Sequence, residues 1–286
     1  MSEEARRQAR EPRVGSLPKA PFQVEWARWA RAALPYVLPP LIAAALLMVG
    51  WELYVQIANE SKFVLPAPSA AIDALFSDFG RFAGDGWRTL WVALAGLTLA
   101  TSVALAFAVV MAHSQLLERA LLPIALMAKV TPVVLLAPLF VIWFGFGWEP
   151  KVIVAALIVY YPVLINSIVG LRDVDPQALD VLRSVDASRR EILWHLRAPS
   201  ALPFLFAALK ISVPLSLIGA VVAELFAAQQ GGLGALISLE LRELQLEKAF
   251  AAILMLSAIG VMLNTAILLL ERATMSWHRS TIASMR

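Results

Sequence analysis

Six long apolar runs alternate with polar links along the 286-residue chain. Each run can cross a hydrocarbon core about 30 Å thick as a helix, which takes roughly 20 residues. Helices are expected because a bilayer offers no water to the backbone, so each segment must satisfy its own polar groups. The pattern predicts an all-α integral membrane protein of about six transmembrane helices. The expected spans are 33–56, 90–111, 120–146, 152–171, 202–227 and 250–270.

The third run differs from the others because Lys129 and Pro132 lie near its middle. A proline inside a helix lacks a backbone donor and clashes with the preceding turn. The run is therefore expected to form either two short helices with a break between them, or one tilted and kinked span.

Two shorter patterns predict a surface helix and a packing face. After residues 65–69, apolar side chains recur at helical spacing, which predicts a short amphipathic helix on the outer face. Gly96, Ala100 and Ala104 lie four residues apart in the second span. Small residues at this spacing let transmembrane helices approach closely.

Positive charges are concentrated in alternate links: one set holds sixteen Lys and Arg residues and the other set holds six. The positive-inside rule places the richer set, which includes both termini and the link 172–197, in the cytoplasm. An even number of spans agrees with this orientation. The expected divisions are a basic cytoplasmic or interfacial segment 1–32, a transmembrane domain 33–271 and a cytoplasmic tail 272–286.

Composition favours the bilayer as solvent, with 60% hydrophobic and only 16% charged residues. A soluble domain carries about a quarter charged residues. The absence of cysteine excludes disulfides and thiolate metal sites, and the three histidines lack metal-ligand spacing. The net charge of +3 is small, and no nucleic-acid partner is expected.

The link 171–203 carries strong local signals for a helix. Asp175 followed by Pro176 is typical of an N-cap with proline at the first helical position. A helix is expected from Pro176 to about Val185, with one apolar face made by Leu179, Leu182 and Val185.

A second short helix is expected in the same link, because Ser188 and Glu191 have the spacing of a capping box. Asp186 stands at the turn between the two helices, and aspartate tolerates a left-handed conformation better than most residues. Pro199 and Pro203 are expected to end the second helix. The link is therefore predicted to be a compact helix–turn–helix on the cytoplasmic side.

The stretch 175–203 resembles the EAA loop of ABC-importer permeases, which reads Glu-Ala-Ala, then a glycine some four residues later, then a closing Leu-Pro. Asp180, Val181 and Leu182 stand at the first three positions, and Asp186 stands at the glycine. The resemblance covers most of the chain and is greatest to the nitrate/sulfonate/taurine group, which includes permeases for pyrimidine precursors. Its other motifs are LPAPS at 65–69, TL at 89–90, WFGFG at 143–147, YP at 161–162, GL at 170–171 and GLG at 232–234.

This resemblance implies a type I ABC importer permease fold with a coupling helix between spans four and five, in an EAA-like loop 172–203. In the family, the second helix of this loop sits in a groove of a separate ATPase subunit. Residues 187–190 would be its contact end here; the alternative is that these charges are only a solvated inner loop. The coupling segment carried over is Asp180, Asp186, Ala187, Ser188, Arg189, Arg190, Glu191, Pro199 and Pro203.

The partners implied are ATP-binding ABC subunits, a periplasmic or lipid-anchored solute-binding protein, membrane lipid and a second permease copy, as a homodimer rather than a heterodimer. The location implied is the bacterial inner membrane. No Gly-x-x-x-x-Gly-Lys-Ser/Thr motif occurs, so no cofactor is expected on this chain, and ATP and Mg are expected on the partner ATPase. The cargo would be a small solute such as a sulfonate, taurine, nitrate or a pyrimidine precursor.

Three polar or kink-forming residues within the spans are candidates for the translocation path: Glu224, Asn166 and Pro138. A charge at mid-bilayer costs about 2.5–3.5 kcal/mol, so such a residue usually faces protein or water. Glu224 is expected either to line the path or an outer gate, or to be a structural residue. Asn166 is more typical of interhelical hydrogen bonding and Pro138 of a kink.

Two other functions are compatible with the spans alone. A secondary transporter driven by an ion gradient would show inverted repeats and ionisable residues at the midplane. No convincing internal repeat is evident here, and carboxylates within the spans are few. A membrane scaffold or sensor without a transport role is the other. Co-purification with a soluble ATPase would separate the three.

Overall fold

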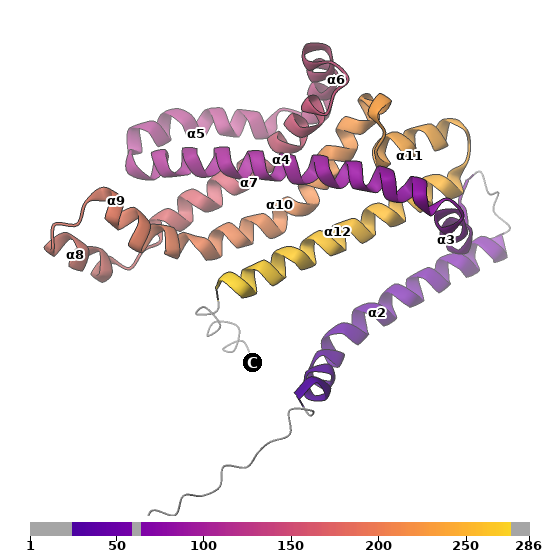
Figure 1. Cartoon of the computed structure of the whole chain (residues 1–286), viewed down its shortest axis with the longest axis horizontal. Coiled ribbons are helices and arrows are strands. Elements are labelled where there is room, and N and C mark those ends of the chain that lie inside the picture. Colours follow the sequence, from indigo (N-terminus) through magenta and orange to yellow (C-terminus); the bar gives the residue numbers. More distant parts are fainter. Residues whose placement is uncertain (1–24, 59–63, 276–286) are drawn as a thin grey trace, which may run out of the picture. The chain divides into compact units, whose positions relative to one another are not determined.

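The computed structural model describes residues 25–58 and 64–275, and within these ranges all regular structure is helical (Figure 1). The chain divides into two compact units between Tyr54 and Val55. The helices are α2 (Glu25–Ala58), α3 (Pro68–Ser77), α4 (Phe79–His113), α5 (Gln115–Val130), α6 (Val133–Phe144), α7 (Glu149–Arg172), α8 (Pro176–Ser184), α9 (Arg189–Ile192), α10 (Ala198–Phe226), α11 (Leu233–Arg242) and α12 (Leu246–Thr274).

Four helices in the described ranges are long and apolar enough to cross a membrane: Phe79–His113, Glu149–Arg172, Arg189–Phe226 and Leu246–Thr274. They contain four of the six predicted runs. The third run is two helices, α5 and α6, bent by 93° at a short break, so the alternative of a broken run is confirmed. The first run lies within α2, a single helix that continues across the predicted boundary at residue 33. The number of spans remains a prediction.

The core of the second unit is a three-helix contact between α4, α7 and α10 (Figure 1). Gly96 of α4 and Gly219 of α10 both face Ala155 of α7. A Cβ built on Gly219 would lie 2.6 Å from the Ala155 Cα, and one on Gly96 would lie 2.6 Å from the Ala155 Cβ. The small-residue face predicted on the second span is buried here, and it lets the three backbones approach closely.

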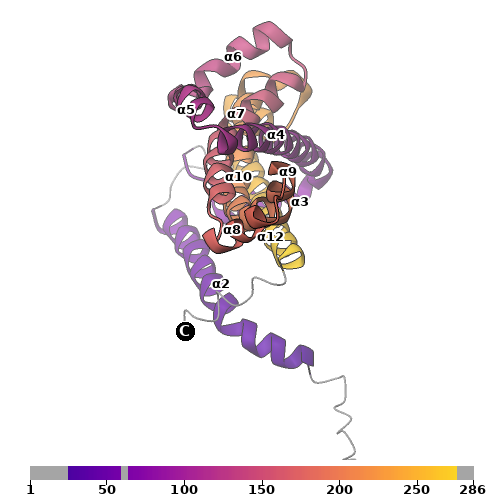
Figure 2. The same ribbon diagram turned by 90° about the vertical axis from the view of Figure 1, so that its left-hand side faces the viewer.

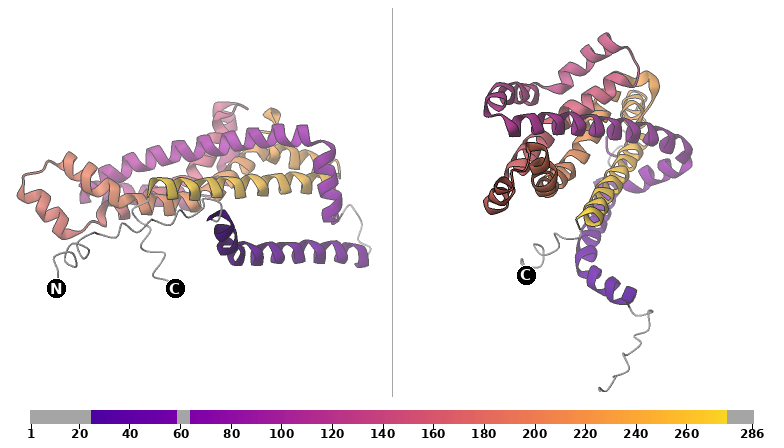
Figure 3. Two further views of the ribbon diagram at one scale, coloured as in Figure 1. Left: turned by 60° about the horizontal axis from the view of Figure 1, so that its bottom comes forward. Right: turned by 60° about the vertical axis from the view of Figure 1, so that its left-hand side comes forward.

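Helices of the second unit run back and forth along one direction, so their connections fall at two opposite ends. The connection 173–197, with α8 and α9, lies at the same end as the turn between α4 and α5 (Figure 1). Figure 2 looks along the helices from this end. At the opposite end lie α3 and α11, and α12 runs alongside α4 between the two ends (Figure 3). The predicted short helix after residues 65–69 is confirmed as α3.

The expectation that Pro199 and Pro203 end the second helix of the connection is wrong. A π-helical turn, Leu193–Arg197, joins α9 to α10 without interruption, and both prolines lie inside α10. Pro199 follows the π turn almost directly, and the widened backbone of that turn makes room for its ring, while Pro203 lies one turn further inside α10. The short helix α9 is therefore a direct extension of the span α10.

Candidate functional site

Two places in the second unit concentrate polar groups at opposite ends of the helices. One is the connection between α7 and α10, here called the knuckle (residues 175–197). The other surrounds a glycine-rich turn, here called the glycine loop (residues 231–234).

The first helix of the knuckle, α8, is capped by hydrogen bonds at both ends. Asp175 Oδ1 accepts a hydrogen bond from the Gln177 N–H (2.9 Å). At the other end, the N–H of Ala187 donates to the Leu182 carbonyl (3.0 Å) and the N–H of Asp186 to the Arg183 carbonyl (3.0 Å). This pair of bonds is a Schellman motif, which places its C′ residue in the left-handed region. Asp186 has φ 54°, so the predicted turn is confirmed.

The second helix of the knuckle begins with the predicted capping box. Ser188 Oγ accepts from the Glu191 N–H (3.3 Å), and Glu191 Oε2 accepts from the Ser188 N–H (2.7 Å). Two donors that a helix start would otherwise leave unpaired are therefore satisfied. A knuckle capped at each turn is a stiff element rather than a loose loop.

The outer surface of the knuckle is available to a partner. Arg189 and Arg190 are exposed and form no ion pair within the described part of the chain. Val181, Val185 and Trp194 are 64%, 69% and 63% exposed. Exposed apolar side chains on an otherwise polar segment are typical of an interaction surface. Sequence reasoning did not predict this exposed surface. It placed Val185 on one apolar face with Leu179 and Leu182, whereas Val185 follows the last helical residue and is largely exposed.

Two arginines, one in the knuckle and one just before it, bond to the neighbouring ends of α4 and α5. Arg197 donates to the Ala112 carbonyl at the end of α4 (3.4 Å). Arg172, the last residue of α7, forms a bidentate pair with Glu118 of α5 (2.8 and 2.6 Å) and donates to the Met111 carbonyl (3.1 Å). Movement of the knuckle would therefore act on α4 and α5 as well as on the spans that flank it.

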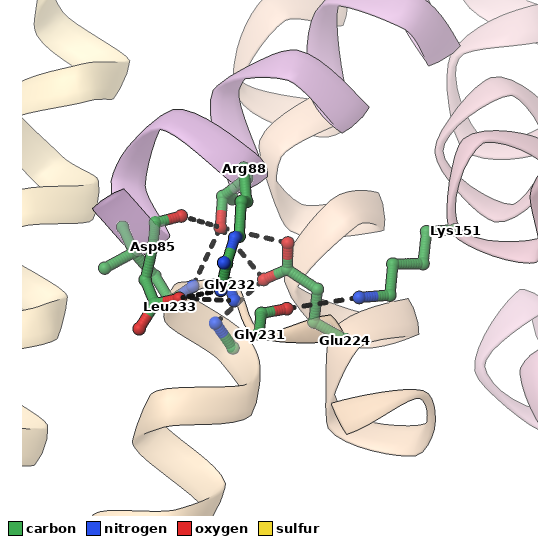
Figure 4. Close-up of polar contacts among 9 residues, drawn as sticks. Asp85, Arg88, Lys151, Glu224, Gly231, Gly232 and Leu233 are labelled. Atoms are coloured by element: carbon green, nitrogen blue, oxygen red, sulfur yellow. Dashed lines mark hydrogen bonds and ion pairs between the residues drawn. The ribbon is translucent and has the colours of Figure 1, made fainter. Parts of the chain in front are cut away.

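At the opposite end, Glu224 is completely buried, with both carboxylate oxygens hydrogen bonded (Figure 4). Thr89 Oγ1 of α4 lies 3.0 Å from each oxygen, and the N–H of Gly234 donates to Oε2 (2.9 Å). Thr89 Oγ1 also accepts from the Leu233 N–H (2.8 Å). The carboxylate thus connects α10 to α4 and to the glycine loop.

Two further side chains bind the same loop. Lys151 of α7, 3% exposed, donates to the Gly231 carbonyl (3.1 Å). Asp85 of α4 accepts from the Gly232 N–H (3.0 Å) and from Arg88 (3.1 Å) (Figure 4). Lys151 also interacts electrostatically with Glu224, so the buried acidic side chain has a buried basic side chain near it.

The structure does not bring the three predicted path residues together. Asn166 donates to the Pro162 carbonyl of its own helix (2.8 Å). It lies 15 residues beyond Lys151 on α7, about 22 Å along the axis. Pro138 is inside α6 and half-buried. Sequence reasoning missed Thr89, Asp85 and Lys151, for which the only signals were a glycine-rich turn and an isolated lysine at a helix start.

Comparisons with known proteins agree with this architecture. Residues 96–276 match the model of the family described as "Binding-protein-dependent transport system inner membrane component". The chain is 35% identical over 273 residues to a riboflavin transport system permease protein of Chloroflexus aurantiacus, covering 94% of this chain and 96% of that protein. It is 30% identical to a formylaminopyrimidine transport permease protein of Halalkalibacterium halodurans, covering 85% and 96%. It is 27% identical to the taurine transport system permease protein of Escherichia coli, covering 82% and 87%.

Proposed function

Since the chain belongs to the family of binding-protein-dependent transport system inner membrane components, we propose that its knuckle is the site where a partner ATPase engages it. The chain is a permease subunit of an ABC importer, and the family works with an ATPase and a solute-binding protein. The alternative of a secondary transporter is not supported by these relatives. The observation that carries the proposal is the exposed, doubly capped knuckle that continues directly into the span α10.

Three properties of the knuckle support engagement by another protein. Its contact end, 187–190, presents two arginines without ion partners in the described ranges. Exposed apolar side chains flank that end, and burying such side chains contributes to docking. Its caps hold the contact end in one conformation, so little conformational entropy is lost when the partner docks. The predicted coupling segment divides accordingly. Residues 187–190 make the contact end, with Asp186 at the turn before it and Glu191 in the capping box. Asp180 pairs with Arg183 on α8 (3.5 Å), and the two prolines lie in α10.

ATP and Mg belong to the partner in this proposal, and this chain carries no nucleotide site of its own. The sequence offers no phosphate-binding loop of the Walker type. The permease instead converts a movement of the ATPase into a change of access for the solute.

We further propose that the knuckle end faces the cytoplasm and that two copies of the chain form one pathway. The links rich in arginine, including the turn before Arg119 and the knuckle, gather at one end of the second unit. That segregation is the one the positive-inside rule describes. Both chain termini would face the same side, although residues 1–24 and 276–286 lie outside the described residues. Asn166 and Pro138 remain candidates for the path between the copies.

The cargo in this proposal is a small solute of the kinds that the relatives are named for. Riboflavin and formylaminopyrimidine come first in a panel, because the two relatives named for them are 35% and 30% identical to this chain. Taurine, aliphatic sulfonates and bicarbonate complete the panel.

A charge placed at the contact end tests the proposal. The chain, its co-purifying ATPase and its solute-binding protein are reconstituted in vesicles, and uptake from the panel and ATP hydrolysis are measured. Ala187→Glu is expected to lower ATP-driven uptake at least tenfold, because a buried negative charge blocks docking. Gln177→Glu adds the same charge to the first turn of α8 and is expected to leave uptake unchanged. Full uptake by Ala187→Glu would refute the proposal.

A further inference from the structure

A completely buried carboxylate in a membrane protein costs free energy, so neighbouring groups must stabilise it. Three groups offset that cost: the Gly234 N–H donates to one oxygen, the single proton of the Thr89 hydroxyl is shared between both oxygens, and Lys151 interacts electrostatically with the carboxyl group of Glu224. Every one of these contacts either reaches the glycine loop or reaches a side chain that binds the loop. Both oxygens are already occupied, so a solute would have to displace the loop to reach the carboxylate.

The glycine loop is shaped to lie against this cluster. Gly231 and Gly232 have φ of 73° and 111°, values that favour glycine. A Cβ built on Gly232 would overlap Glu224 Cδ, and one on Gly234 would lie 2.5 Å from the Val221 carbonyl oxygen. Loop and carboxylate therefore fit each other without room for a side chain between them.

The contacts also connect four elements at one end of the second unit. Thr89 and Asp85 come from α4, Lys151 from α7, and Glu224 from α10, while the loop leads into α11. An ion pair also connects α4 to α11 directly, because Arg81 of α4 pairs with the buried Glu240 of α11 (3.0 Å).

We propose that Glu224, with Thr89 and Lys151, is a positioning group that keeps the glycine loop closed throughout the transport cycle. The ends of α4, α7 and α10 then move with α11 as one body. The inference rests on the importer function but not on the knuckle as the ATPase site. If the ATPase did not dock at the knuckle, the glycine loop would still be expected to stay closed. If the glycine loop opened, the ATPase could still dock at the knuckle.

The test uses the absence of native cysteine, which makes an introduced thiol the only one in the chain. Leu233 is completely buried and its N–H bonds Thr89, so Leu233→Cys reports whether the loop is closed. The rate of its reaction with a soluble maleimide is measured beside solute uptake. In the otherwise unchanged chain the reaction is expected to be slow and equally slow at rest and during ATP turnover. Acceleration during turnover would overturn the proposal, because the loop would then open in the cycle.

Two substitutions of Glu224 separate positioning from contact with solute. Glu224→Gln keeps an acceptor for Gly234 and a partner for Thr89, and Lys151 keeps its bond to the Gly231 carbonyl. Uptake and labelling are therefore expected within about threefold of the parent. Glu224→Ala removes the acceptor of the Gly234 N–H and the link from Thr89 to α10, although Thr89 keeps the Asp85 carbonyl and the Leu233 N–H as partners. Labelling is expected to rise at least tenfold while uptake falls. Equal loss of uptake in both variants with unchanged labelling would overturn the proposal, because the charge itself would then serve the solute.

Two further variants keep the test decisive if Glu224→Ala fails to fold. Thr89→Val removes the hydroxyl from the cluster at nearly constant volume, and it is expected to speed labelling, whereas Thr89→Ser is expected to behave as the parent. Glu240→Gln is the matched control, because it alters a buried glutamate that bonds no atom of the loop. Labelling of Leu233→Cys is expected to stay slow there, and acceleration equal to that of Thr89→Val would overturn the specific role of the cluster.

Discussion

Asp186 shows how one residue sets the geometry of the knuckle. It occupies the C′ position of a Schellman motif with φ 54°, where most helices that end this way have glycine. Aspartate accepts this conformation at a modest cost, and the capping box that follows fixes the next helix. The direction in which α9 leaves α8 therefore depends on a single left-handed residue.

Substitutions at Asp186 should separate strain from side-chain chemistry. Asp186→Gly is expected to keep full uptake and to relieve about 1 kcal/mol of backbone strain. Asp186→Val is expected to lower uptake several-fold, because a β-branched residue is a marked outlier at positive φ. Uptake by reconstituted vesicles checks both variants, and equal uptake in the two would mean that the turn geometry has no part in coupling.

At the scale of elements, α5 has few specific ties to the rest of its unit. Most of its side chains are exposed, and only Ala125 is buried. The bidentate pair between Arg172 and Glu118 is the ion pair that joins it to α7. Because Arg172 lies three residues before the knuckle, this pair is placed to pass a movement of the knuckle to α5.

Charge reversal measures that connection. Arg172→Glu and Glu118→Arg are each expected to lower uptake several-fold, since each places like charges in contact. The double variant is expected to recover most of the loss. Recovery will be incomplete, because the bond from Arg172 to the Met111 carbonyl is not restored. Losses that simply multiply in the double variant would show that the pair does not couple the two helices.

Close contact between α7 and α10 gives a second prediction at this scale. Gly219→Ala would place a Cβ 2.6 Å from the Ala155 Cα, so the helices must separate. The expected loss of stability is about 1–3 kcal/mol, seen as a lower unfolding temperature in detergent. Gly260→Ala is the control, since its Cβ would meet only Leu217 Cδ1 at an ordinary 3.5 Å. Equal unfolding temperatures for both variants would contradict the close contact.

Sequence patterns predicted the features that depend on neighbouring residues. Apolar run length gave the spans α4, α7, α10 and α12, and the caps at Asp175 and Ser188 gave both helices of the knuckle. The cluster around Glu224 was out of reach, because Thr89 lies 135 residues away in the chain. The continuation of the helix through Pro199 could not be predicted either, because a π turn that accommodates a proline has no clear local sequence signal.

At the scale of the molecule, the two ends of the second unit have different construction. One end exposes a stiff knuckle with arginines and apolar side chains, and the other end buries its charges in a closed cluster. Long helices connect the two ends, and α4, α7 and α10 pack too closely to slide freely. A push on the knuckle is therefore expected to tilt these helices together, which is how an ATPase on one side could change access on the other.

The central claim, that the ATPase grips this permease at the knuckle, has a direct test in cross-linking. Ala187→Cys and Gln230→Cys each introduce the only thiol of the chain, one at the contact end and one at the opposite end. With a short thiol-to-amine cross-linker in the reconstituted complex, an adduct with the ATPase is predicted from position 187 and not from position 230. An adduct from position 230 alone would contradict the account.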